Sequence, residues 1–200
     1  MLHPSISLLD DSKVHGKGLI ATADIRKGEI VWQLDTDAQR LTLDDLTDRA
    51  DDTILEFDYF AFQVGEDEYA LPEGIDKYMN HSCDPNTWWG DDITLVARRE
   101  IHPGEEVTYD YTTADISRKY YLACECGAAT CRRAITNLDY LDPSWQEDYG
   151  RNLPSFVLQA IERVQSGRKH HFAKIALVLM REWFRLKILV RRQIYGTLLV

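Results

Sequence analysis

Three of the four cysteines lie in one short stretch, CECGAATC at 124–131, and the fourth, Cys83, lies well upstream in NHSCDPN. Only one residue separates Cys124 from Cys126, and one disulfide with two thiols left over would be an unusual framework, so a bound metal explains the spacing better. Zinc takes four ligands at tetrahedral angles, and this loop can supply three thiolates while Gly127 lets the backbone turn. A closed site then requires Cys83. The alternative left open is four reduced thiols without a metal.

Length and composition place further bounds on the chain. At 200 residues, with 44% hydrophobic side chains, it can bury one sizeable core. The first residues, MLHPSISLLDDSK, lack the basic region and long apolar run of a signal peptide. The longest uncharged apolar stretch, IALVLM at 175–180, is too short to span a bilayer. Together with zinc-type cysteine usage, these features predict an intracellular protein in a reducing compartment, cytoplasmic or nuclear.

Charge is distributed unevenly along the chain. Residues 1–160 hold 14 Lys and Arg against 31 Asp and Glu, whereas residues 161–200 hold 9 against 2. An acidic body repels nucleic-acid phosphates, so we expect no direct nucleic-acid binding, and it favours cationic partners. A merely soluble acidic surface explains the same composition.

Short strand-like runs separated by Gly, Pro and Asp dominate the first 111 residues and indicate a mostly β domain; the runs are SISLL, GLIAT, EIVWQL, ILEFDYFAFQV, ITLVARR and EVTYDY. Two turns, DIRKGEIV at 24–31 and EIHPGEEV at 100–107, share the pattern acid-Ile-x-x-Gly-Glu, which we interpret as a repeated local solution rather than a duplicated domain. A helix is predicted over 42–50, with Thr42 as its cap. After residue 150 the apolar pattern takes the helical period.

The last residues predict a basic amphipathic helix. One face carries apolar side chains and another carries basic ones; the apolar set is Ile175, Leu179, Trp183, Leu186, Val190 and Ile194, and the basic set is Lys174, Arg181, Arg185 and Arg192. Through 172–194 such a helix can lie on an anionic membrane surface, dock on a partner or pair with a second copy, and packing against its own domain is the plain alternative. VQSGRKHH at 164–171 predicts a hinge before it.

Three further motifs stand in a fixed order, namely Gly-Lys-Gly at 16–18, NHSCDPN in the middle, and GEEVTYDY before the cysteine loop. A Gly-x-Gly alone is weak, and without a third glycine or a following helix it argues against a dinucleotide fold. Taken together, four segments resemble the SET-domain protein-lysine methyltransferases with a post-SET zinc motif. They are VHGKGLIATADIRKGEIV, YMNHSCDPNT, ARREIHPGEEVTYDY and CECGAATC, and the resemblance covers roughly residues 5–135.

The resemblance implies a mostly β, β-clip-like SET fold with a pseudoknot, in which the 80–84 segment and the strand ending at Tyr111 are threaded past each other. A zinc-bound post-SET loop would close over the active site, with C-terminal helices beyond it. The implied divisions are a SET domain over 5–118, a post-SET zinc knuckle over 119–135, a linker and helical segment over 136–163, and a basic helical tail over 164–200. One zinc ion would be held by Cys83, Cys124, Cys126 and Cys131.

The implied reaction is methyl transfer from S-adenosylmethionine to the ε-amine of a lysine in a basic protein. Tyr111 resembles the family's principal catalytic tyrosine, whose hydroxyl orients the amine. Tyr109 resembles the position that restricts how many methyl groups fit, and a tyrosine there favours monomethylation. Tyr59 resembles the second channel tyrosine. The alternative for each is a core aromatic with a hydrogen-bonded hydroxyl.

The same resemblance implies contacts with the methyl donor through backbone groups near the first glycines, a polar pair in the middle motif and one aromatic side chain. The residues are Lys17, Gly18, Leu19, Asn80, His81 and Tyr69. A turn residue is the plain alternative for Asn80, and a satisfied core histidine is the alternative for His81.

Two features depart from the family's pattern. Arg132 stands where relatives usually have glycine, so we expect a different final turn or an arginine that faces the substrate. The 35–56 insert is short and acidic, which favours a basic peptide such as a histone tail or a ribosomal protein, although a solvated acidic helix explains it equally well.

Three function classes therefore compete. The intact tyrosine set favours an active protein-lysine methyltransferase. The second class is a SET-fold binding module that recognises basic peptides with little or no turnover, and the third is a methyltransferase that acts on something other than protein lysine.

Overall fold

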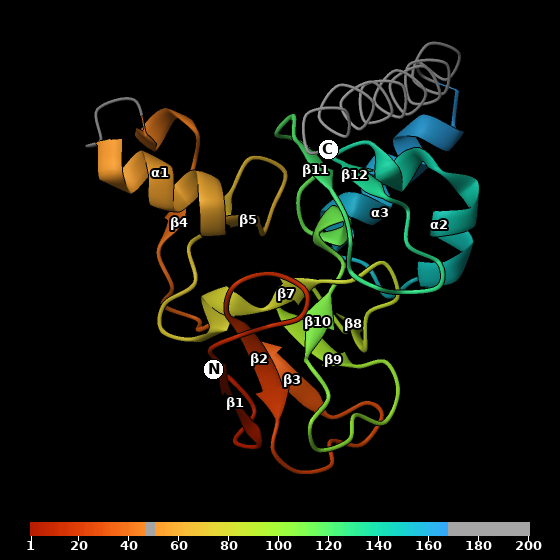
Figure 1. Ribbon diagram of the computed structural model, residues 1–200. Helices are drawn as coiled ribbons and strands as arrows, with labels where there is room; N and C mark the ends of the chain where they lie inside the picture. The colour runs from red at the N-terminus through yellow and green to blue at the C-terminus, as the bar shows by residue number, and fades with distance from the viewer. Residues whose placement is uncertain (47–50, 168–200) are drawn as a thin grey trace, which may run out of the picture.

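The computed structural model describes residues 1–46 and 51–167 (Figure 1). The strands are β1 (Ile6–Leu9), β2 (Gly18–Ala21), β3 (Ile30–Gln33), β4 (Arg40–Leu41), β5 (Phe62–Gln63), β6 (Tyr69–Ala70), β7 (Asn80–His81), β8 (Thr87–Trp89), β9 (Thr94–Ala97), β10 (Thr108–Tyr109), β11 (Tyr121–Ala123) and β12 (Ala134–Thr136). The helices are α1 (Asp51–Phe60), α2 (Pro143–Tyr149) and α3 (Ser155–Gln165), with 3₁₀ turns η1 (Asp44–Leu46), η2 (Asp76–Tyr78), η3 (Tyr111–Thr113) and η4 (Asp139–Leu141).

The predicted helix over 172–194 and the second half of the predicted hinge, residues 168–171, lie outside the described residues, so what was predicted for them stays a prediction. Within the residues that the structure describes, no helix is long and apolar enough to cross a membrane.

The short strands form small sheets rather than one large one. In the described part of the chain these are β1–β2, β3–β9–β8, β4–β6–β5, β7–β10 and β11–β12. Every pair is antiparallel except β7–β10, which is parallel. Parallel strands need a long connection between them. Here the connection from β7 to β10 contains β8 and β9. The mostly β fold predicted from the sequence is confirmed.

The main core lies between β2, β3 and β9. Leu19, Val31 and Leu95 point into it and are almost fully buried. Three large aromatic rings pack edge to face in this core. The Trp32 ring centroid lies 5.4 Å from that of Phe62 and 6.5 Å from that of Trp89. Both indole N–H groups are satisfied, because Trp32 donates to Asp76 at 2.8 Å and Trp89 donates to Thr113 at 2.8 Å.

The two turns that resemble each other in sequence pair with each other in space. Ile25 and Ile101 exchange both backbone hydrogen bonds at 2.9 Å, and both side chains are fully buried. In each turn the glutamate that ends the motif accepts a hydrogen bond from a backbone N–H three residues earlier, and the glycine before it has positive φ. Only glycine adopts that conformation without strain, which explains why the motif repeats.

The region around α1 differs from the sequence prediction. The predicted helix over 42–50 is only the 3₁₀ turn η1 where it is described, and residues 54–60, the first part of the predicted strand-like run, belong to α1 instead. Burial there follows a helical spacing of three and four residues through Ile54, Phe57 and Ala61. Phe57 is fully buried against Tyr69, at 5.4 Å between ring centroids.

The parallel pair β7–β10 brings two of the sequence motifs side by side. Ser82 donates to the Tyr109 carbonyl at 3.1 Å, and Asn86 receives the Thr108 N–H at 3.0 Å while donating to the Glu106 carbonyl at 2.9 Å. This close passage is the proximity that the predicted pseudoknot requires. In Figure 1, β7 and β10 lie beneath a space flanked by α1 on one side and β11 on the other.

Truncation at the paired turns tests this core. We expect Ile101→Ala to lower the free energy of unfolding by about 2–5 kcal/mol, because it leaves a cavity in a tightly packed region. Ile75→Ala is the matched control, since Ile75 is 39% exposed and its truncation should cost less than about 1 kcal/mol. Urea unfolding of both variants measures the difference, and equal losses would contradict the packing described for these turns.

Candidate active site

A cavity of about 990 Å³ opens between the sheets, α1 and the cysteine loop. Its walls come from segments far apart in the sequence, namely residues 14–17, 58–62, 76–81 and 118–126, together with Tyr109 and Tyr111. It therefore exists only when the two sequence motifs at 78–87 and 97–111 and the cysteine loop are assembled around one another.

Tyr111 stands at the floor of this cavity, one residue after Asp110 and at the start of η3. Its hydroxyl donates to the Met79 carbonyl at 3.1 Å, and its backbone N–H donates to His81 Nδ1 at 3.3 Å. Burial raises the pKa of the Tyr111 phenol, so the hydroxyl stays protonated at neutral pH. The Tyr111 hydroxyl proton is donated to the Met79 carbonyl, so the oxygen lone pairs can accept a hydrogen bond from the cavity.

Tyr109 lies beside Tyr111, with ring centroids 5.0 Å apart, and also lines the cavity. Burial raises the pKa of Tyr109 well above its usual value, so it too is neutral. Residues two apart in a strand share one face, which would bring the two rings together if both lay in β10. The structure brings them together by another route, since β10 ends at Tyr109 and Tyr111 belongs to a 3₁₀ turn.

Tyr59 reaches the cavity from the opposite wall. It lies near the C-terminal end of α1, is 67% exposed, and packs against Phe60 at 4.8 Å between ring centroids. Sequence reasoning placed it in a strand-like run, and the structure places it on a helix whose exposed side borders the opening. Tyr120 also lines the cavity, although sequence reasoning did not select it.

The residues predicted to hold the methyl donor fall into two groups. Lys17, Asn80 and His81 line the cavity. Asn80 fixes the loop before β2, because its amide donates to the carbonyls of His15 at 3.1 Å and Lys17 at 2.8 Å. The loop therefore owes its position to a side chain from β7.

The other three predicted residues do not line the cavity. Leu19 is fully buried in the main core, and Gly18 is packed so closely that a Cβ atom would collide with Glu106 and Asn80. Tyr69, predicted to face the methyl donor, is 1% exposed, with its ring between Phe57 and the Arg118 guanidinium. These residues support the cavity from behind, because the aromatic and glycine patterns that selected them also serve packing.

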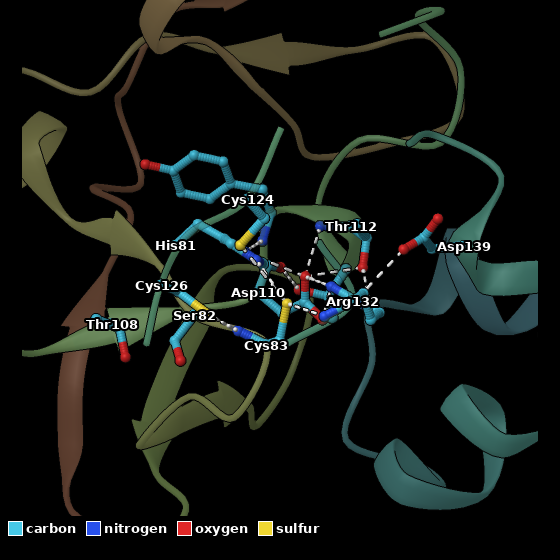
Figure 2. Close-up of polar contacts among 12 residues, drawn as sticks. His81, Ser82, Cys83, Thr108, Asp110, Thr112, Cys124, Cys126, Arg132 and Asp139 are labelled. Atoms are coloured by element: carbon cyan, nitrogen blue, oxygen red, sulfur yellow. Dashed lines mark hydrogen bonds and ion pairs between the residues drawn. The ribbon is translucent and has the colours of Figure 1, made fainter. Parts of the chain in front are cut away.

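The four cysteines meet beside the cavity, and none forms a disulfide. Cys124 Sγ lies 3.7 Å from Cys83 Sγ and 3.7 Å from Cys131 Sγ, while the Cys83 N–H donates to Cys126 Sγ at 3.4 Å (Figure 2). Zinc–sulfur bonds of about 2.3 Å at tetrahedral angles separate sulfur atoms by about 3.8 Å, so this spacing fits a zinc ion.

His81 is a fifth candidate ligand. Its Nε2 lies 3.3 Å from Cys83 Sγ, and the ligand atoms of His81, Cys83, Cys124 and Cys126 all lie within 4.8 Å of one another. Hydrogen bonding from Cys124 lowers the pKa of the Cys83 thiol, with His81 and the Arg132 backbone adding to the effect. A thiolate at Cys83 is the form that binds metal.

Arg132 corrects one sequence expectation. It neither occupies the turn position that needs glycine nor lines the cavity. The residue with positive φ is Arg133, at φ 65°, whereas the Arg132 side chain turns inward and is 17% exposed. Of the two expectations for Arg132, the structure therefore agrees with a different final turn, in which Arg133 adopts the strained left-handed conformation, and not with an arginine that faces the cavity.

Asp110 joins these parts, and sequence reasoning missed it. Its carboxylate, 0% exposed, accepts from Arg132 at 2.7 and 2.8 Å (Figure 2). It also accepts from the Tyr149 hydroxyl at 2.9 Å. Trp145 Nε1 donates to it at 3.2 Å, and Thr112 donates to it from both its backbone N–H and its hydroxyl. An acid between two tyrosines, in the strand-like run EVTYDY, was the signal that would have identified it.

Comparison with known proteins relates part of this sequence to a family. The family model described as "SET domain" matches residues 16–112. "Histone-lysine N-methyltransferase trr" of Drosophila melanogaster is 30% identical over 132 residues, and "Histone-lysine N-methyltransferase 2B" of Homo sapiens is 31% identical over 136 residues. These matches cover 61% and 62% of this chain but only 5% of each relative.

Among solved structures, "crystal structure of KRYPTONITE in complex with mCHG DNA and SAH" matches with a TM-score of 0.49 and 24% identity, covering 66% of this chain and 29% of that one. Residues 16–112 therefore match the SET domain, and the chain is similar over about three fifths of its length to histone-lysine N-methyltransferases.

Metal analysis of single variants separates the two possible ligand sets. We expect the wild-type protein to hold one zinc ion per chain and Cys131→Ser to lose most of it, because Cys124 Sγ lies 3.7 Å from both Cys83 Sγ and Cys131 Sγ. His81→Gln should retain the metal. Elemental analysis of the purified full chain reads this out, and a full zinc complement in Cys131→Ser with none in His81→Gln would instead establish a set of three cysteines and one histidine.

Proposed function

We propose that this chain transfers a methyl group from S-adenosylmethionine to the ε-amine of a lysine in a basic protein, with histones as the first substrate class to test. The observation that carries the proposal is the pair of neutral tyrosines, Tyr109 and Tyr111, at the floor of a cavity bordered by the Asn80-held loop. The similar proteins reported above are named as histone-lysine methyltransferases, which supports the same class.

The reaction explains why neutral tyrosine hydroxyls suit this site. A lysine amine has a solution pKa of about 10.4 and must lose its proton before its lone pair can attack. Entry into a cavity with apolar walls lowers that pKa, because desolvation disfavours the charged form. S-adenosylmethionine supplies a methyl carbon on a positively charged sulfur, which leaves as a neutral thioether when nitrogen takes the methyl group.

Tyr111 is the residue best placed to orient the amine. Because its proton is donated to the Met79 carbonyl, its oxygen can accept a hydrogen bond from the amine N–H and aim the nitrogen lone pair. Orientation of this kind supplies much of the rate in a one-step transfer. Tyr109 would fill space beside the nitrogen and so favour the addition of one methyl group.

We assign the methyl donor to the side of the cavity bordered by residues 14–17, where Lys17, Asn80 and His81 offer backbone and side-chain contacts. Gly18, Leu19 and Tyr69 would act indirectly, by holding that wall in place. The four cysteines would hold zinc and keep residues 118–126 closed over the cavity. Tyr59 would border the entrance for the substrate lysine.

The substrate class is proposed from charge as well as from relatives. Residues 1–160 are strongly acidic, which attracts a basic peptide and disfavours direct contact with nucleic acid. A binding module for basic peptides and a transferase for non-protein amines would share the same cavity, so each is an outcome of the following experiment.

Methyl transfer by a single-atom variant tests the mechanism. We expect wild-type protein to place labelled methyl from S-adenosylmethionine on lysines of core histones or other basic proteins, and Tyr111→Phe to lose about 100-fold in kcat while binding the donor as before. The variant removes only the oxygen that orients the amine. Equal turnover in both proteins would contradict the assigned role.

Tyr109→Phe is the matched control, because it removes the neighbouring hydroxyl from the same floor. It should keep turnover and shift the product from monomethyl-lysine toward higher methylation, as measured by mass spectrometry. Donor binding without any transfer in the wild type would favour the binding module, and transfer only to small amines would favour the third class.

A further inference from the structure

One arginine connects the cysteine cluster to the tyrosine pair. The Arg132 guanidinium reaches three partners, since Nη2 donates to both oxygens of Asp110 at 2.7 and 2.8 Å, Nη1 donates to Thr112 Oγ1 at 3.4 Å, and Nε lies 3.4 Å from Asp139 Oδ2. Figure 2 shows Arg132 between Asp110 and Asp139. Three nitrogens in one rigid plane hold these contacts, and a single ammonium group cannot span them.

The backbone of the same residue is fixed by the cysteines. Arg132 directly follows Cys131, whose Sγ lies 3.7 Å from Cys124 Sγ, and its own N–H donates to Cys83 Sγ at 3.4 Å. A change in the arrangement of the four sulfur atoms therefore moves the Arg132 backbone. The side chain carries such a movement toward Asp110.

On the side of the tyrosine pair, Asp110 fixes the start of η3 and with it the position of Tyr111. It lies between Tyr109 and Tyr111 in the chain, and its carboxylate accepts the Thr112 N–H at 3.1 Å as the cap of η3. His81, whose Nδ1 receives the Tyr111 N–H, lies 3.4 Å from the same carboxylate. A buried carboxylate is costly without its partners, so Asp110 follows Arg132 rather than separating from it.

We propose that Arg132 is a positioning residue that couples metal binding at the four cysteines to the placement of Tyr111 through Asp110. It is not a catalytic residue, because it does not line the cavity and touches neither tyrosine ring. The kinetic part of this inference rests on the proposed methyl transfer, whereas the structural coupling does not.

The kinetic test compares neighbouring arginines in the full chain. We expect Arg132→Lys to keep one zinc ion and its KM for S-adenosylmethionine but to lose about 10- to 100-fold in kcat, since small misplacement of a reacting group has effects of this size. Arg133→Lys is the matched control, because Arg133 is adjacent and exposed. Wild-type kcat in Arg132→Lys, or an equal loss in Arg133→Lys, would overturn the inference.

A second readout needs no activity. Trp145 Nε1 donates to Asp110 at 3.2 Å and to Thr112 at 3.1 Å, so its ¹⁵N indole signal reports on that carboxylate. Replacing zinc by cadmium, a larger ion that thiolates also bind, should shift the Trp145 signal in wild type and Arg133→Lys, and shift it by less than half as much in Arg132→Lys. Trp145→Phe assigns the signal.

The outcomes of the two readouts are distinguishable. An absent metal-dependent shift in the wild type overturns the coupling whatever Arg132→Lys does, including a failure to fold. An undiminished shift in folded Arg132→Lys also overturns it. If the wild type shows the shift but transfers no methyl group to any acceptor, the proposed function fails and the coupling stands.

Discussion

The buried carboxylate of Asp110 is the constraint on which the rest of the structure depends. Burial alone raises the pKa of this group, but Arg132, His81 and the surrounding hydrogen bonds outweigh that effect and hold the pKa below its usual value. A buried charge costs several kcal/mol unless it is fully partnered. Thr112 is a local partner, and the other partners come from three segments that are distant in sequence, at His81, Arg132 and α2. Loss of any of these contacts would leave the buried charge less well compensated.

This arrangement suits a fold of small sheets. Strands of two to four residues bury little apolar surface each, and residues 118–136 add only one two-stranded sheet. The wall that those residues contribute needs other anchors. The four cysteines provide one, the Arg132–Asp110 ion pair provides a second, and Trp145 and Tyr149 from α2 hold the same carboxylate from the far side.

The sequence predicted the mostly β fold and the convergence of Cys83 with the cysteine loop, because short motifs fix local backbone and metal ligands have few alternatives. The sequence-based prediction was wrong where tertiary packing determines whether a segment forms a strand or a helix. Residues 54–60 were predicted to begin a strand-like run yet belong to a helix, on which Phe57 is buried against Tyr69. Tyr69 was assigned to the donor side of the cavity and belongs to that cluster instead.

Long-range pairing was hidden in the same way. Nothing local to Asp110 predicts Arg132 as its partner, and nothing local to Arg132 shows that the left-handed residue is its neighbour Arg133. Both follow from the close passage of β7 and β10 beside the cysteine loop. The contacts predicted for 172–194 concern residues outside the described structure and stay predictions.

The most direct test of the account is a calorimetric titration of the full chain with S-adenosylhomocysteine, the product left after methyl transfer, before and after zinc removal. The account predicts one molecule bound per zinc-loaded chain and markedly weaker binding once the metal is removed, because the wall formed by residues 118–126 loses its anchor. Equal affinity in both forms, or no binding by the zinc-loaded protein, would contradict it.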